Sequence, residues 1–215
     1  MKLGRILLAS LPLLCGTSLF AQGERWNLYG DYSYIQFNPT ISGAQSRAFN
    51  GGGGGIQYNF AKILGIRADF QGYGSTQWTL TASSPIVTPH GTIPAGTFKS
   101  NGNMFTYLFG PVVRLPFGRL VVNGELLFGQ SNTNGYGSLE TAINNAGGNV
   151  QVTGTQHPFT MMLGGGVDVS LNHHIALRLA DLDYVLTRYT NPLTSTNNQN
   201  SFRYVGGIIF KFGEH

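Results

Sequence analysis

Residues 201–212 read SFRYVGGIIFKF, and their character alternates from one position to the next. One face of the extended chain carries aromatic and aliphatic residues with a single glycine: Phe202, Tyr204, Gly206, Ile208, Phe210 and Phe212. The opposite face carries Arg203 and Lys211. A soluble sheet turns its apolar face toward a core, whereas a barrel in lipid turns apolar side chains outward and polar ones inward. The segment therefore predicts a strand, and the rest of the chain must decide which face is the inside.

Seven further segments alternate in the same way, which makes eight in total. They cover residues 26–37, 50–60, 64–73, 103–115, 119–130, 157–171 and 175–188. Their lengths suit a tilted strand, which crosses the hydrocarbon with about 9 to 11 residues. One face of the alternating segments is apolar and the other is small, polar or charged, as a narrow lumen requires. After residue 21 no stretch approaches the ~20 apolar residues of a spanning helix, so a membrane-spanning form of this chain would use strands.

Two irregularities lie within these segments. Leu177 and Leu179 share one face, but Leu182 belongs to the other, which predicts a β-bulge at residues 180–182 that returns Asp183 to the face of Arg178. Residues 51–55 are five consecutive glycines, which permit a close approach of the neighbouring strand. The alternative is a flexible linker. The run is not a phosphate-binding loop, because no Lys-Ser or Lys-Thr follows it.

The connections between the segments alternate between long and short. Residues 61–63, 116–118 and 172–174 form short connections, and residues 38–49, 74–102, 131–156 and 189–200 form long ones. Membrane barrels of the outer-membrane type have short periplasmic turns and long extracellular loops. The long connections are rich in Asn, Thr, Ser and Gly and show no periodicity, so we expect them to be irregular and mobile.

The N-terminus predicts export. Residues 1–21 combine a basic start, an apolar stretch and a final alanine, which indicates a signal peptide cleaved after Ala21 and a mature barrel domain over residues 22–215. Cleavage removes Cys15, the only cysteine, so the mature chain has neither a disulfide nor a cysteine metal site. It leaves eleven basic residues against nine acidic ones, a balance too small to indicate binding of nucleic acid.

The run YLFGP at residues 107–111, the run GGGVDV at 164–169 and the terminal GIIFKF at 207–212 resemble the small eight-stranded outer-membrane β-barrels, the OmpA-like barrel domain, across residues 22–215. The resemblance implies an all-β, eight-stranded antiparallel up-and-down transmembrane β-barrel in the outer membrane of a Gram-negative bacterium. It also implies that the barrel contacts outer-membrane lipid and lipopolysaccharide.

The same resemblance implies a C-terminal assembly signal, Gly207, Phe210 and Phe212, that the barrel-insertion machinery reads. The chain departs from the usual signal in two ways, because Val205 replaces a polar residue and three residues follow Phe212. The resemblance does not extend to a peptidoglycan-binding domain, so it does not imply a wall-anchoring role.

The inward face collects ten of the 22 charged residues of the chain. They are Asp31, Arg67, Asp69, Arg114, Glu125, Asp168, Arg178, Asp183, Arg203 and Lys211. Unpaired charges in a narrow interior are costly, so we expect an interlocking network with Asn59, Gln71 and Asn123. An eight-stranded barrel has room for little besides side chains, which favours a plugged lumen over the alternative, a narrow ion-conducting pore.

No catalytic residue, cofactor or metal site is assigned. His90 and His157 lie in or beside outer loops that contain few acidic residues, and His173 and His174 are adjacent, so their side chains point apart. We therefore expect a structural or surface-interaction protein rather than an enzyme, with a loop ligand that the sequence does not identify. The alternative is a soluble, secreted, lipocalin-like barrel that binds a small apolar ligand within an apolar interior.

Overall fold

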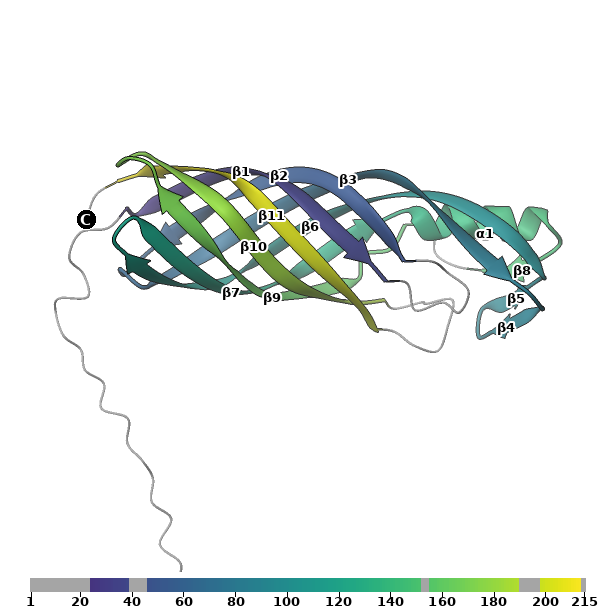
Figure 1. The fold of residues 1–215 in the computed structure, drawn as a ribbon. Coiled ribbons are helices and arrows are strands. Elements are labelled where there is room, and N and C mark those ends of the chain that lie inside the picture. The colour runs from purple at the N-terminus through teal and green to yellow at the C-terminus, as the bar shows by residue number, and fades with distance from the viewer. Residues whose placement is uncertain (1–23, 39–45, 152–154, 190–197, 214–215) are drawn as a thin grey trace, which may run out of the picture.

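Eight antiparallel strands close into one barrel (Figure 1). The computed structural model describes residues 24–38, 46–151, 155–189 and 198–213, so the predicted signal peptide lies outside the described residues. The barrel strands are β1 (Trp26–Phe37), β2 (Arg47–Asn59), β3 (Leu64–Ala82), β6 (Gly96–Phe117), β7 (Leu120–Thr133), β9 (Phe159–Ser170), β10 (Ile175–Arg188) and β11 (Asn198–Phe212). Each pairs with the next along the chain, and β1 pairs with β11 to close the ring. The predicted eight-stranded up-and-down barrel is confirmed.

The two faces of β6 show which side of the wall is outside. Phe105, Phe109 and Val113 are exposed on the outer surface, whereas Leu108 and Arg114 between and beside them are buried in the lumen. The same order holds around the ring. Exposed outward residues include Trp26, Leu28, Ile56, Ile66, Phe70, Val122, Phe128, Leu163, Leu179, Tyr184, Phe202, Tyr204, Ile208, Phe210 and Phe212. The soluble lipocalin-like alternative needs its apolar face inside and does not fit this arrangement.

The bulge and the glycine run are both part of the barrel wall. The register of β10 shifts after Arg178 against both of its neighbours, β9 and β11, which is the predicted bulge. Residues 51–55 lie within β2 and pair with β1 on one side and β3 on the other. The alternative of a flexible linker is therefore wrong.

One end of the barrel carries the short turns and the C-terminus, and we call it the turn end; the opposite end is the cap end (Figure 1). At the cap end, β3 and β6 extend far beyond the predicted segments and pair as far as Ala82 and Gly96. A three-stranded sheet of β4 (Ile86–Thr88), β5 (Gly91–Ile93) and β8 (Asn149–Val150) and the helix α1 (Gly135–Asn145) stand beside them. The described helix is not long and apolar enough to cross a membrane.

The expectation of irregular loops is wrong for residues 74–102 and for most of residues 131–156. These segments carry few apolar residues at irregular spacing, and such residues show no period when read along one segment. Their order comes from contacts between segments, since Leu80, Phe98, Leu139 and Ile143 pack into one buried cluster. The other two long connections, 38–49 and 189–200, lie largely outside the described residues.

Candidate functional site: the lumen and its cap

The turn end of the lumen is closed by an ion-pair triad. The Nζ of Lys211 lies 2.8 Å from Glu24 Oε1, and Arg114 Nη2 lies 3.5 Å from Glu24 Oε2. Lys211 also donates to the Ser170 hydroxyl at 3.1 Å. Burial raises the pKa of Glu24, but the hydrogen bond and charge of Lys211 outweigh it, so the pKa lies below its ordinary value of 4.5. Glu24 is therefore ionised at neutral pH.

Arg67 lies at the centre of the next layer. Its guanidinium pairs with Glu125 Oε2 and lies 3.4 Å from Asp181 Oδ2, while its Nε donates to Gln57 Oε1 at 3.0 Å. The side chains of Arg67, Glu125 and Asp181 are each at most 1% exposed. Two carboxylates and one amide therefore satisfy a guanidinium that water does not reach.

Arg203 joins two further carboxylates to the same layer. Its Nη1 donates to Asp69 Oδ1 at 2.9 Å and its Nε to Asp183 Oδ2 at 2.7 Å, and its Nη2 lies 3.8 Å from Glu125 Oε1. Asp69 also accepts a hydrogen bond from the Tyr29 hydroxyl at 3.1 Å. The acids come from β3, β7 and β10 and Arg203 comes from β11, so the network ties these four strands together across the lumen.

Arg178 completes the network toward the turn end. Its Nε donates to Asp168 Oδ1 at 3.1 Å, and its Nη1 lies 3.4 Å from Asp181 Oδ2. Asp168 also accepts a hydrogen bond from Asn123 Nδ2 at 2.6 Å. The guanidinium stacks on Tyr29, with Cζ 4.8 Å from the ring centroid. Such a cation–π contact adds to the ion pairs where water is excluded.

The structure places all ten charged residues predicted for the lumen on the inner face. Nine are buried, and Asp31 is half-buried, with its Oδ1 accepting from Gln71 at 2.8 Å. The network also contains two acids that the sequence did not single out, Asp181 and Glu24. Asp181 lies within the bulge, where parity does not assign a face, and Glu24 precedes the first strand, where there is no alternation to count.

An apolar layer fills the lumen between the charges and the cap, and we call it the septum. It consists of Ile35, Phe37, Phe49, Tyr73, Met104, Leu108, Leu127, Met162 and Val185. Leu127 and Met162 are completely buried. The prediction of a lumen face that is small, polar or charged throughout is therefore wrong at this level. The septum also supports the expectation of a plugged interior, because moving an ion from water into an apolar layer costs much free energy.

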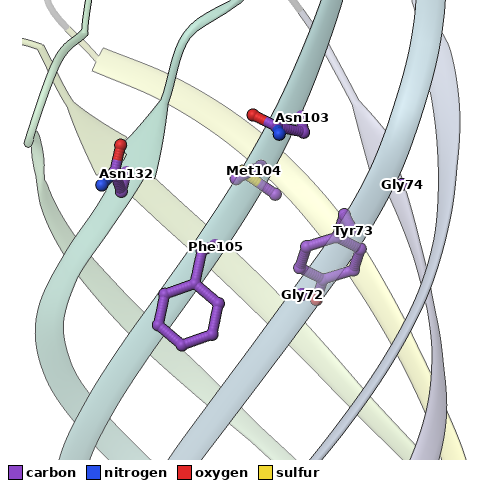
Figure 2. Close-up of a pocket in the computed structure, with 7 residues that line it drawn as sticks. All are labelled: Gly72, Tyr73, Gly74, Asn103, Met104, Phe105 and Asn132. Atoms are coloured by element: carbon purple, nitrogen blue, oxygen red, sulfur yellow. The ribbon is translucent and has the colours of Figure 1, made fainter.

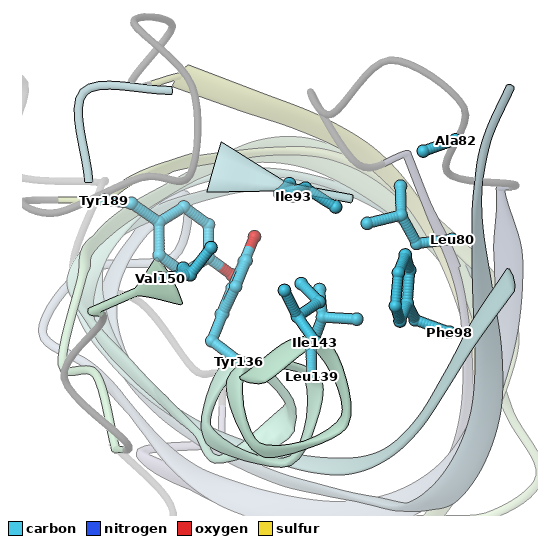
Figure 3. Close-up of a cluster of buried hydrophobic side chains, with 9 residues drawn as sticks. All are labelled: Leu80, Ala82, Ile93, Phe98, Tyr136, Leu139, Ile143, Val150 and Tyr189. Carbon is cyan, nitrogen blue, oxygen red and sulfur yellow. The ribbon is translucent and has the colours of Figure 1, made fainter. Parts of the chain in front are cut away.

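The cap comprises residues 76–102 and 135–150, and it has a core of its own (Figure 3). That core consists of Leu80, Ala82, Ile93, Phe98, Tyr136, Leu139, Ile143 and Val150, and it also packs with Tyr189, which follows β10. Figure 3 shows the ribbons of the barrel strands surrounding this cluster, with Tyr136, Leu139 and Ile143 pointing from α1 toward the other members. The cap therefore covers the mouth of the barrel with packed apolar side chains.

Polar contacts fix the cap to the barrel strands and to itself. The Ser100 hydroxyl of β6 donates to Gly135 O at 2.6 Å, at the start of α1. Near the end of α1, the Asn144 side chain donates to Val150 O and accepts from Val150 N, both at 2.8 Å. Burial raises the pKa of Tyr136, whose ring packs edge-on against Tyr189 with centroids 5.1 Å apart, so its hydroxyl stays protonated. The helix is therefore held at both ends.

The outer surface of β6 changes character at Asn103. Phe105 and the outward residues toward the turn end are apolar, whereas Thr97, Lys99, Asn101 and Asn103 are polar and exposed. A hollow of about 460 Å³ lies at this change (Figure 2). Its lining is Gly72, Tyr73, Gly74, Asn103, Met104, Phe105 and Asn132. Gly72 pairs with Phe105, so no side chain of β3 faces the Phe105 ring.

Comparison with solved structures identifies the fold. The chain superposes on Neisserial surface protein A with a TM-score of 0.58 and 10% identity, over 87% of this chain and 97% of that one. For the outer membrane protein OprG from Pseudomonas aeruginosa the TM-score is 0.52 at 12% identity, over 90% and 98% of the two chains. The chain has the fold of a small outer-membrane β-barrel.

A third barrel of this fold is Ail of Yersinia pestis, solved in complex with the heparin analogue sucrose octasulfate. Its TM-score is 0.50 at 12% identity, over 88% of this chain and 99% of that one. No family model and no curated protein matches the sequence. At these identities the similarity establishes the fold, and together with the apolar outer belt it supports the outer-membrane location expected from the sequence.

Proposed function

We propose that this protein is a closed, non-catalytic outer-membrane barrel that presents its cap for contact at the cell surface. The observation that carries the proposal is the buried core of the cap, because connections of a mere pore or anchor need no packed structure of their own. The septum and the charge network support the same function, since they close the lumen at two further levels. The barrel then serves as a rigid support for the cap.

The charges at the cap end favour an anionic partner. Arg47 begins β2, Arg188 ends β10 and Lys99 lies in the cap-end part of β6. Among the described residues there, Glu140 is the acid. The undescribed loop segments 39–45, 152–154 and 190–197 contain no charged residue. Lipopolysaccharide presents phosphates at this level of an outer membrane, and a sulfated sugar bound to Ail is a similar anion. We infer that lipopolysaccharide is the surface partner.

Binding of lipopolysaccharide to the refolded chain in phospholipid vesicles tests this function. We expect binding that weakens with added salt, which screens the exposed Lys99 and Arg188 more strongly than the half-buried Arg47. Binding should also weaken in the triple variant Arg47→Gln, Lys99→Gln, Arg188→Gln, which removes these charges. The variants Lys62→Gln and Arg119→Gln, at the turn end, serve as the matched control and should bind as the wild type does. Equal binding by the wild type, the triple variant and the two control variants would contradict the assignment of the cap end as the contact surface.

Conductance in a planar bilayer tests closure of the lumen. We expect no steady openings from the purified chain. Regular openings that change when the septum residue Leu127 is replaced by serine would instead support the narrow ion-conducting pore. The absence of catalysis has its own test, since deacylation or palmitoylation of lipid A by the purified chain, lost in His157→Ala, would contradict it.

We further infer that Gly207, Phe210 and Phe212 are read by the barrel-insertion machinery. The support is their place on β11, where Phe210 and Phe212 are exposed on the outer face and pair with Leu28 and Trp26. Phe212→Ala should reduce the folded fraction in cells while the purified variant still refolds in detergent. A matched change on the outer face of β9, Leu163→Ala, should leave the cellular fraction unchanged. Equal losses in both variants would indicate general destabilisation.

A further inference from the structure

The described lumen contains more acids than bases. Its carboxylates are Glu24, Asp31, Asp69, Glu125, Asp168, Asp181 and Asp183, and its cations are Arg67, Arg114, Arg178, Arg203 and Lys211. The lumen therefore has a formal charge of −2 if every group is ionised. An uncompensated charge inside a closed, lipid-embedded barrel costs several kcal/mol per group. A positive species besides the side chains must balance it.

Three of these carboxylates, Glu125, Asp181 and Asp183, lie close together. They are at most 3% exposed, and each offers an oxygen within 4.8 Å of an oxygen of the other two. The strands bring them together, since Glu125 lies on β7 while Asp181 and Asp183 share the inner face of β10 after the bulge.

Each carboxylate of this trio has one oxygen that faces a guanidinium and one oxygen without a hydrogen-bond partner. In each residue one oxygen faces a guanidinium: Glu125 Oε2 and Asp181 Oδ2 face Arg67, and Asp183 Oδ2 faces Arg203. The second oxygens, Glu125 Oε1, Asp181 Oδ1 and Asp183 Oδ1, are buried without a hydrogen-bond partner. Only Glu125 Oε1 has a further cation near it, Arg203 Nη2 at 3.8 Å. Buried oxygens with unused lone pairs, on three side chains that lie together, indicate a bound species that the oxygens coordinate.

We propose that Glu125, Asp181 and Asp183 bind one divalent cation, Ca²⁺ or Mg²⁺, inside the closed lumen. Hard divalent cations take carboxylate oxygens as ligands and complete their shells with water. One such ion balances the formal charge of the lumen, and it links β7 to β10 across the barrel. The cation therefore acts as a structural staple in a site that is separate from the cap and its surface contacts.

The test uses the full mature chain refolded in detergent without lipopolysaccharide, so that lipid-bound cations do not contribute. After loading with Ca²⁺ or Mg²⁺ and desalting, elemental analysis should find about one ion per chain, the occupancy of a single closed site. Chelation with EDTA should lower the thermal midpoint of the heat-modifiable band. Terbium provides a second readout, because the nearby Tyr29, whose ring lies 5.3 Å from Arg67 Cζ, should sensitise its emission.

Isosteric variants separate the site from general charge effects. Asp181→Asn and Glu125→Gln should each weaken metal binding by roughly tenfold or more, the scale seen when even outer-shell partners of metals are lost. EDTA should lower their thermal midpoints less than that of the wild type, because they hold less metal. Asp31→Asn removes one half-buried negative charge of the lumen outside the trio and should keep the ion.

Two results would overturn the proposal. One is a wild-type chain that retains no metal and whose thermal midpoint rises on acidification from pH 8 to pH 5 whether or not cations are present, which would show that protons balance the charge. The other is metal retention that Asp31→Asn reduces as much as Asp181→Asn does, which would show diffuse attraction rather than a site.

Discussion

At the scale of single residues, glycines make room for the polar network. A Cβ added to Gly55 would collide with Ala68 O on β3 and with the Tyr29 hydroxyl. Tyr29 is the residue on which Arg67 and Arg178 stack and which donates to Asp69. The glycine run of β2 therefore serves the lumen as well as the coiling of the sheet. The backbone of β3 approaches these glycines closely, as expected for glycine within a strand.

We predict that Gly55→Ala lowers the free energy of unfolding by about 1–3 kcal/mol, the usual cost of overpacking. Gly30→Ala is the matched control, because its new Cβ would meet only Gly53 O at 4.0 Å. Urea unfolding in lipid vesicles, followed by tryptophan fluorescence, measures both. If the Gly55→Ala barrel were as stable as Gly30→Ala, the prediction would be wrong, because Tyr29 and the β3 backbone would then accommodate the added methyl group without cost.

A second residue-scale prediction concerns pH. Because Lys211 and Arg114 hold the pKa of Glu24 below its ordinary value of 4.5, the triad stabilises the fold above that pH and loses its contribution as the pH falls through the lower, folded-state pKa. Glu24→Gln should therefore reduce stability at pH 7 by roughly 1 kcal/mol or less, and the difference from wild type should vanish near pH 3. Urea titrations at both pH values check this, and a difference that persists at pH 3 would contradict it.

At the scale of elements, β6 records the position of the bilayer in its outward residues. They are apolar from Leu115 back to Phe105 and polar from Asn103 to Thr97. Residues 96–103 therefore extend about 25 Å along the strand beyond the apolar belt, at the usual rise per residue. This places the cap outside the hydrocarbon and the hollow beside Phe105 at its boundary.

The depth of the belt gives an element-scale prediction. Phe109, 57% exposed, lies near the middle of the apolar run, and Phe117, 63% exposed, lies beside the turn that follows β6. Phe109→Lys should cost about 2–4 kcal/mol of folding free energy in vesicles, whereas Phe117→Lys should cost about 1 kcal/mol or less. Reversible urea folding into vesicles measures the two values. Equal costs would mean that the bilayer sits elsewhere on the strand.

At the scale of the whole molecule, the protein has two separate apolar interiors. The septum lies within the barrel, and the cap core lies at its mouth. None of the residue pairs that join β7, β9, β10 and β11 includes a residue of the cap core. Unfolding of the cap therefore leaves this part of the barrel wall intact. We expect the two parts to lose structure at different denaturant concentrations.

Leu139→Ala tests this separation. Leu139 is completely buried in the cap core, so its truncation should cost the cap about 2–5 kcal/mol. Amide exchange over residues 135–150 should accelerate, while the barrel keeps its heat-modifiable band. Ser138→Ala, at the exposed neighbouring position on α1, should change neither. Loss of both signals in Leu139→Ala would show that cap and barrel fold as one unit.

The sequence by itself determined the barrel, because alternation is a local property. In each strand of the wall, apolar residues alternate with small, polar or charged ones, and the two sets face opposite sides. The bulge in β10 could be predicted for the same reason, because the apolar residues change from one face of the strand to the other between Leu179 and Leu182. Inside and outside themselves were decided with the help of loop lengths, the near-terminal Phe212 and the glycines of the polar face, and Phe109 and Arg114 lie where that interpretation put them.

The tertiary structure alone decided the cap, the septum and the partners within the charge network. Leu80, Phe98, Leu139 and Ile143 come from segments without a period, and their order exists only when those segments meet. Leu127 and Met162 are also exceptions to the polar pattern of the lumen. They are paired across β7 and β9 and belong to the same buried apolar cluster. Which carboxylate meets which guanidinium depends on stagger around the closed ring, and no single strand contains that information.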